Sequence, residues 1–259
     1  MARTNNPHEA SVKSWATRRG EAQDGGRRET VQQRGDWGTK PASPLEYNGL
    51  TPDSPEVKAL AEKAHAAAVF QEPEATRAVT AAIEASGGHL SGLAHRIKAP
   101  DAIANKIIRD CRSDHVEPEA AIAKLNDIVR YTALYPASVL VERVAIAHKS
   151  LLDAGWEHFD SKAKNFFAPG DPYDGYNCVY INKKTGAKFE MQFHTPESIK
   201  IKALAHDIYK KYRELPAMDT ARHTRKRLFD EMVGLWNNYD RPTNWEKLPG
   251  KITRQRSDS

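Results

Sequence analysis

Long apolar runs are missing from this sequence of 259 residues. No stretch of eighteen or more apolar residues occurs, which argues against a membrane-spanning helix, and we expect no membrane partner. The first twenty residues are rich in arginine and lack the apolar segment of a secretory signal. Only two cysteines, Cys111 and Cys178, are present, and their spacing is not that of a metal site. Scarce cysteine suits a reducing compartment, so we expect a cytoplasmic protein.

Two sequence patterns of well-known enzyme classes are also missing. The chain has no Gly-x₄-Gly-Lys-Ser/Thr loop, which argues against a P-loop kinase, and no Gly-x-Ser-x-Gly nucleophile elbow. What the chain does have is charge, with 39 Lys and Arg against 34 Asp and Glu and a net charge of +5. A modest positive excess favours an anionic partner such as a nucleotide or RNA.

Composition divides the chain into three parts. Residues 1–50 are basic, with no apolar period, and are predicted to be a disordered tail. A solvated tail and an RNA-binding or partner-binding arm both fit this composition. Residues 51–240 carry the periodic patterns of a folded domain, and residues 241–259 form a second basic tail.

Helix and strand patterns alternate irregularly within the folded part. A proline after a capping residue starts one helix at Ser54–Pro55, and we expect a second helix from about Pro73 to Gly87. Further helices are predicted at 100–111, 138–154, 195–215 and around 228–236, and strands at 127–134, 156–167, 176–182 and 187–194. Helices around several strands without strict alternation predict an α+β fold.

The second strand of the predicted hairpin has two chemically different faces. Period two places Phe189, Met191 and Phe193 on one face, which we expect to be buried. Lys188, Glu190, Gln192 and His194 share the opposite face, which in an arbitrary hairpin is ordinary solvent-exposed surface. Asp127 opens another predicted strand, and two carboxylates on neighbouring strands can hold Mg²⁺ together with substrate phosphates.

Basic residues precede the first of these carboxylates. Arg96 and Lys98 are two residues apart, so an extended segment would direct both side chains to one side. Lys106 follows on the next predicted helix. Several cations that converge on one point are what phosphate binding requires.

Five stretches, in this order, resemble the synthetase domain of RelA/SpoT-type alarmone synthetases. They are 96–106, 125–131, 174–177, 189–195 and 205–210, and they span about residues 90 to 215. The pattern departs from the housekeeping enzymes at His194, where those carry arginine, and at Arg130, which lies closer to Asp127 than their usual arginine. The acceptor loop, Tyr173-Asp-Gly-Tyr176-Asn, differs as well. These departures resemble the small toxic branch found in phages and toxin–antitoxin pairs.

The resemblance implies a nucleotidyltransferase-like mixed β-sheet flanked by helices, and an ATP-dependent pyrophosphokinase that acts on a ribose 3′-hydroxyl. It implies catalytic roles for Asp127, Glu190 and Gln192, with Asp127 and Glu190 holding Mg²⁺ as the cofactor. The residues implied in binding the ATP phosphates are Arg96, Lys98, Lys106 and Lys164. Those implied in binding the acceptor are Tyr176, Tyr173, His194 and Arg130, with His206 and Lys210 flanking the site.

Several alternatives stay open at this point. The acceptor can be GDP or GTP, an adenosine nucleotide, or the 3′ end of tRNA, and a growth-inhibiting toxin can have an antitoxin protein as partner. A housekeeping-type (p)ppGpp synthetase and a catalytically silent nucleic-acid-binding or phage accessory protein are the competing functions. Arg130 can instead form a structural salt bridge, and His206 and Lys210 can belong to a solvated basic helix face.

Overall fold

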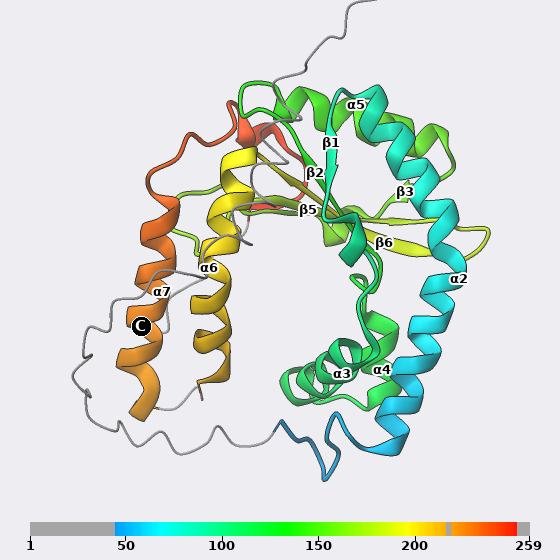
Figure 1. Ribbon diagram of the computed structural model, residues 1–259, viewed down its shortest axis with the longest axis vertical. Coiled ribbons are helices and arrows are strands. Elements are labelled where there is room, and N and C mark those ends of the chain that lie inside the picture. The colour runs from blue at the N-terminus through cyan, green and yellow to red at the C-terminus, as the bar shows by residue number, and fades with distance from the viewer. Residues whose placement is uncertain (1–44, 216–218, 253–259) are drawn as a thin grey trace, which may run out of the picture. The chain divides into compact units, whose positions relative to one another are not determined.

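The predicted hairpin forms the centre of a seven-stranded sheet in the computed structural model, which describes residues 45–215 and 219–252 (Figure 1). The strands are β1 (His89–Ser91), β2 (Arg130–Leu134), β3 (Glu157–His158), β4 (Lys164–Asn165), β5 (Tyr176–Ile181), β6 (Lys188–His194) and β7 (Lys251–Ile252). Their order is β1-β2-β6-β5-β4-β7, and β3 pairs with β5 beside this path. β2 runs parallel to β6, whereas β5 runs antiparallel to it, so the sheet is mixed.

Six α-helices flank this sheet in the described part of the chain, which confirms the α+β prediction. They are α2 (Pro55–Ala85), α3 (Pro100–Asp114), α4 (Pro118–Lys124), α5 (Leu140–Asp153), α6 (Pro196–Glu214) and α7 (Asp219–Trp236). Figure 1 shows α6 and α7 side by side. Within 45–215 and 219–252, no helix has the length and apolar character that crossing a membrane requires.

The prediction of separate helices before and after Pro73 is wrong, because α2 continues through this residue. Proline cannot donate a hydrogen bond to the carbonyl four residues earlier, that of Val69. Val69 is 46% exposed and Phe70 is 87% exposed, so this stretch of the helix lies at the surface, where water can bind the carbonyl.

The region around the first predicted carboxylate also differs in detail. The expected strand 127–134 begins only at Arg130, so Asp127 lies in the loop before β2. The expected extended segment 156–167 is divided into β3, a 3₁₀ turn (Asp160–Lys162) and β4. The short elements β1 and α4 were not predicted.

The apolar core lies between one face of the sheet and the helices α2 and α5. Phe189, Met191 and Phe193 of β6 are fully buried there, which confirms the predicted inward face. A second apolar cluster joins the first half of α2 to α3 and α4. The other face of β6 therefore lies opposite the main core.

α6 begins directly after β6, as the cap and proline at 195–196 predicted. The Thr195 side chain accepts a hydrogen bond from the Ser198 backbone N–H at 3.0 Å, and Ser198 in turn accepts one from the Thr195 N–H at 2.9 Å. This reciprocal capping box fixes the direction in which α6 leaves the sheet.

Positions 1–44 of the predicted N-terminal tail and 253–259 of the predicted C-terminal tail are outside the described residues, and the tail predictions are not tested there. Residues 241–252 of the second tail are described, and they include β7 and the buried Leu248.

Candidate active site

The polar face of β6 is not ordinary solvent-exposed surface. Gln192 is 5% exposed and His194 is completely buried, although both lie on the face away from the main core. Strand register places Arg130 of β2 and Val179 of β5 on either side of Glu190. Residues opposite each other in a sheet point to the same face, so Arg130 and Glu190 are neighbours. Buried polar groups in such a row require specific partners.

Asp127 lies near this row and pairs with Lys98, whose Nζ is 2.6 Å from Asp127 Oδ2. Burial alone would raise the pKa of Asp127, but the charges of Lys98, Lys106 and Arg130 outweigh it and hold that pKa below its usual value. Burial, reinforced by the negative charge of Asp127, raises the pKa of Glu190. The two carboxylates therefore interact. The site favours the ionised form of Asp127 and the protonated form of Glu190.

These two carboxylates fit a shared magnesium ion. Asp127 Oδ1 is buried and has no hydrogen-bond partner among the described residues, which leaves one carboxylate oxygen for a cation. No group of three or more His, Cys, Asp or Glu suited to a metal is found in 45–215 and 219–252. Mg²⁺ does not need such a cage, because one or two carboxylates together with phosphates and water bind it.

The predicted phosphate ligands are only partly brought together. Lys98 and Lys106 both act electrostatically on Asp127, and Lys106 also pairs with Asp110 at 3.3 Å. Arg96 points elsewhere, with its Nε 2.5 Å from Glu72 Oε1 on α2. The expectation that Arg96 and Lys98 point to one side is wrong because Arg96 has helical backbone angles, φ −70° and ψ −23°, and the period of two fails there.

Lys164 projects from the same face as Gln192. It lies opposite Asn177 of β5, which in turn lies opposite Gln192 of β6, and it is exposed. Two strand spacings separate Lys164 from Gln192, roughly 10 Å. A long flexible lysine at that distance can contact a phosphate bound over the row.

Lys202 of α6 was missed by sequence reasoning and holds a central place. Its Nζ donates to Gln192 Oε1 at 2.7 Å and lies 3.4 Å from His194 Nε2. Gln192 Nε2 donates to Glu190 Oε1 at 2.5 Å, so a hydrogen-bonded chain runs from Lys202 to the carboxylate. Burial and the charge of Arg130 lower the pKa of Lys202 to about 8. Lys202 precedes His206 by one helical turn, and this spacing could have placed it on the same helix face as the predicted flanking residues.

His194 is a buried neutral imidazole. Burial, helped by the positive charges of Lys202 and Arg130, lowers its pKa well below the usual value. Its Nδ1 lies 3.0 Å from Ser198 Oγ, and its Nε2 lies 3.0 Å from the Tyr173 hydroxyl. His194 thus ties the start of α6 to the loop that carries Tyr173.

The two candidate stacking tyrosines lie on opposite sides of the sheet. Tyr176 is 1% exposed and stacks on Phe193 in the core, with ring centroids 5.9 Å apart. The structure therefore contradicts the predicted stacking of Tyr176 on an acceptor base, because strand alternation turns its ring inward. Tyr173 lies on the polar side, where Lys202 Nζ is 5.5 Å from its ring centroid.

The flanking residues lie on α6, and a further cation lies on α3. His206 and Lys210 are both exposed, and the Lys210 Nζ is 4.0 Å from an oxygen of Asp207. Arg109, which sequence reasoning also missed, follows Lys106 by three residues, on the same side of α3. Burial and the charge of Arg213 on α6 lower the pKa of Arg109, so cations from both helices act on one region.

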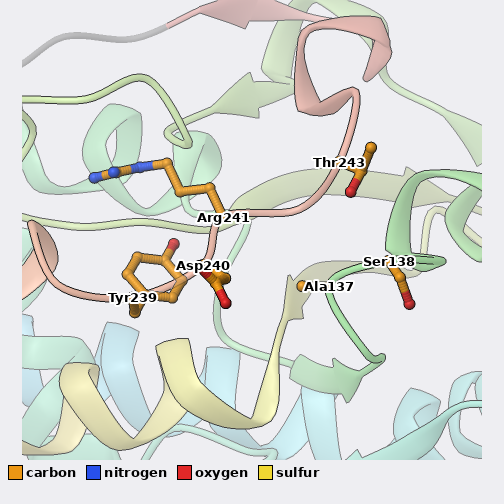
Figure 2. Close-up of a pocket in the computed structure, with 6 residues that line it drawn as sticks. All are labelled: Ala137, Ser138, Tyr239, Asp240, Arg241 and Thr243. Carbon is orange, nitrogen blue, oxygen red and sulfur yellow. The ribbon is translucent and has the colours of Figure 1, made fainter.

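A surface pocket of about 480 Å³ contains no side chain of this row in its lining (Figure 2). It is lined by Ala137, Ser138, Tyr239, Asp240, Arg241 and Thr243, none of which is a predicted site residue. Arg241 Nε forms an ion pair with the buried Asp174 Oδ2 at 2.8 Å, and the Tyr239 hydroxyl donates a hydrogen bond to the same oxygen at 2.6 Å. Arg241 and Tyr239, two of the lining residues, thus hold the loop at Asp174.

Comparisons with known proteins found similarity only among solved structures. No protein-family model matches the chain, and no curated protein matches it. The small alarmone synthetase 1 from Bacillus subtilis bound to its product pppGpp is similar at 17% identity and a TM-score of 0.35, over 56% of this chain and 72% of that one. The same enzyme bound to AMPCPP is similar at 15% identity and a TM-score of 0.36, over 66% and 87%.

A GTP pyrophosphokinase family protein from Streptococcus pneumoniae is also similar, at 14% identity and a TM-score of 0.41, over 65% of this chain and 86% of that one. Because these TM-scores lie below 0.5, the likeness does not by itself identify a family or an activity for this chain.

Proposed function

We propose that the chain is a magnesium-dependent pyrophosphokinase of the RelA/SpoT type, which transfers the β,γ-pyrophosphate of ATP to a ribose 3′-hydroxyl. The observation that supports this most is the buried polar row of β6 with Asp127 beside it. Glu190, Gln192 and His194 are held by named partners on a face that contributes nothing to the main core. A binding module without chemistry has no need for two interacting carboxylates among cations.

The cations of the site match a triphosphate donor. Lys98, Lys106 and Arg130 act electrostatically on Asp127, and Arg130 also acts on Glu190. Arg109 interacts with Asp127 as well, and Lys164 projects from the same face of the sheet. Phosphoryl transfer depends on holding the donor in line and on neutralising charge on its oxygens. Asp127 and Glu190 would hold Mg²⁺, which supplies part of that neutralisation. Arg96 is bound by Glu72 and lies outside this group.

Glu190 is the group placed to accept the proton of the attacking hydroxyl. In the proposed reaction the 3′-oxygen bonds to the β-phosphorus, the bond from that phosphorus to the α,β-bridging oxygen breaks, and AMP leaves. A raised pKa makes Glu190 a better base than an ordinary carboxylate. Tyr173, on the polar side of the sheet, is the candidate for contact with the acceptor base.

Transfer can be followed with ATP labelled in its γ-phosphate, with Mg²⁺ and GDP, GTP, adenosine nucleotides or deacylated tRNA in parallel reactions. We expect label to move to one acceptor class, with one AMP formed for each transfer. An excess of inorganic phosphate over AMP would indicate simple hydrolysis, and label retained in ATP with every acceptor would contradict the proposal. The acceptor that is labelled distinguishes the nucleotide activity from the tRNA activity.

A further inference from the structure

A second pocket, of about 250 Å³, opens on the same face of the sheet as Glu190, at the Lys188 end of β6. Its floor is apolar and its rim is basic. The lining residues are Ala123, Lys124, Asn126, Phe159, Lys162, Val179, Ile181 and Lys188. We call it the Phe159 pocket.

The rim of the Phe159 pocket is positively charged. Lys124, Lys162 and Lys188 come from α4, the 3₁₀ turn and β6, and no carboxylate is among the lining residues. Burial, followed by the charge of Lys162, lowers the pKa of Lys188, so these two ammonium groups already act on each other. An anion placed between them would relieve this repulsion.

The contacts of the rim lysines leave them able to bind a ligand. Lys188 Nζ donates to the Ala123 carbonyl at 3.0 Å, and an ammonium group has two further N–H donors. Lys124 pairs with Asp114 at 3.4 Å, but both side chains are about half exposed and such a pair is weak. Asp160, near Lys162 in sequence, contacts His158 instead.

The floor of the pocket offers an aromatic ring. Phe159 is 44% exposed, and Val179 and Ile181 of β5 lie beside it in the pocket lining. A flat apolar group can stack on such a ring, and a phosphate attached to that group can bind the lysines. A nucleoside phosphate combines such a planar ring with a doubly charged group in one small molecule.

The Phe159 pocket adjoins the carboxylates. Val179 lies opposite Glu190 in the strand register, and Ile181 lies opposite Lys188, so all four side chains share one face. Directly opposed residues have Cβ atoms roughly 5 Å apart. Asn126, which lines the pocket, immediately precedes Asp127.

From these contacts we infer that the Phe159 pocket binds a nucleoside phosphate, with its base against Phe159 and its phosphate between Lys162 and Lys188. The inference extends the proposed function, but binding at this pocket does not require transfer. The nucleoside phosphate is either the neighbour of the reacting nucleotide in an oligonucleotide or a separate mononucleotide.

Photolabelling of the full chain with 8-azido-AMP tests this inference, with Mg²⁺ and AMPCPP present to fill the proposed donor site. We expect the label on the peptide that contains Phe159. Phe159→Ala and Lys162→Ala should each weaken labelling by about fivefold or more, as expected for the loss of one stacking or phosphate contact. Both residues are exposed enough for these variants to fold, which the thermal midpoint checks.

Lys183→Ala is the matched control. Lys183 is 72% exposed, pairs with Glu157 and does not line the pocket, so this variant removes an equal charge nearby and should label like the wild type. Competition separates the two sources of nucleotide, because the dinucleotide ApA should compete better than AMP if the pocket holds part of a strand. Equal competition by AMP indicates a separate mononucleotide.

The inference fails if the Phe159 peptide is not labelled, or if Lys162→Ala labels as well as Lys183→Ala. It fails equally if inorganic phosphate competes as well as AMP, since the ring would then contribute nothing. A chain that transfers pyrophosphate but does not label at Phe159 loses only this inference. A chain that labels at Phe159 but transfers nothing loses only the proposed function.

Discussion

At the residue scale, Lys202 determines which way the Gln192 amide faces. An ammonium group can only donate hydrogen bonds, so Gln192 must turn its oxygen toward Lys202 and its NH₂ group toward Glu190. Without Lys202 the amide could rotate, and Glu190 would lose a fixed donor. Lys202 is therefore a positioning residue for the carboxylate in the proposed reaction.

Lys202→Met should reduce kcat by roughly tenfold or more, the usual effect of removing a partner that orients an active-site ligand. KM for ATP should change less, because Lys202 contacts Gln192 and not the proposed phosphate ligands. The pKa of Lys202 is about 8, so its charge is lost as pH rises through that value, and wild-type activity should fall there. The variant should lack this alkaline decline.

Lys211→Met, on the exposed side of the same helix, is the control and should keep the wild-type profile. An alkaline decline near pH 8 that persists in Lys202→Met would show that Lys202 does not position Glu190 through Gln192.

The two carboxylates should respond to neutralisation with opposite effects on stability. Glu190→Gln and Asp127→Asn should each reduce transfer by at least about a hundredfold. The folded pKa of Glu190 is raised, so its contribution to stability is present below the unfolded pKa and is lost as pH rises through the folded value. At pH 7, Glu190→Gln should therefore raise the Tm.

Asp127 behaves in the reverse way, because its folded pKa is lowered. Its contribution is present above the unfolded pKa and is lost as pH falls through the folded pKa, so Asp127→Asn should lower the Tm at pH 7. Thermal unfolding at pH 7 and pH 4 measures both effects, which should diminish at the lower pH. Equal shifts of the same sign would show that the carboxylates do not differ as described.

At the scale of elements, the sequence patterns predicted individual helices and strands, but they did not predict which distant strands pair in the sheet. The hairpin 176–194 and the helix after Thr195 were predicted because their periods and caps are local. The parallel pairing of β2 with β6 brings Arg130 beside Glu190, and no local pattern specifies which distant strands pair. Tyr176 was misassigned although alternation along β5 places it with the buried Cys178 and Tyr180.

The same limit applies to side chains near helix ends. Arg96 was grouped with Lys98 on the assumption of an extended segment, but a 3₁₀ turn ends there and the guanidinium reaches Glu72. The carboxylate that captures it lies 24 residues earlier, on a helix that the sequence pattern divides in two. Its partner could only be found once the path of α2 was known.

Pro73 gives a prediction for α2. Pro73→Ala should restore a backbone N–H to the helix interior and stabilise the protein by about 1–3 kcal/mol, less the entropy that proline removes from the unfolded chain. Pro55→Ala is the matched control, because the first turn has no intrahelical partner for that N–H and little change is expected. Denaturant unfolding measures both, and equal midpoints for the two variants would contradict this reasoning.

At the scale of the whole molecule, the toxin activity that the sequence resemblance implies would act on the growth of the cell. A pyrophosphokinase that consumes ATP and modifies nucleotides or tRNA should stop growth when it is expressed in bacteria. Glu190→Gln, expressed at the same level, should be harmless because transfer is lost. Growth that continues with the active wild-type chain would contradict the implied toxin activity and would not affect the proposed enzymatic function.

The contacts of Arg241 and Tyr239 make the loop at Asp174 depend on an intact C-terminal segment. Both side chains bind the carboxylate of Asp174, which lies 65 positions before Tyr239 in the sequence. Asp174 directly follows Tyr173. A proteolytic cut after Asn238 would leave every strand unbroken, but it would separate Tyr239 and Arg241 from α7 and so weaken their hold on Asp174. Tyr173 would then be positioned by its own contacts, among them those with His194 and Asn177. Protein cut at this point should keep the circular dichroism spectrum of the intact chain and show a lower affinity for the acceptor.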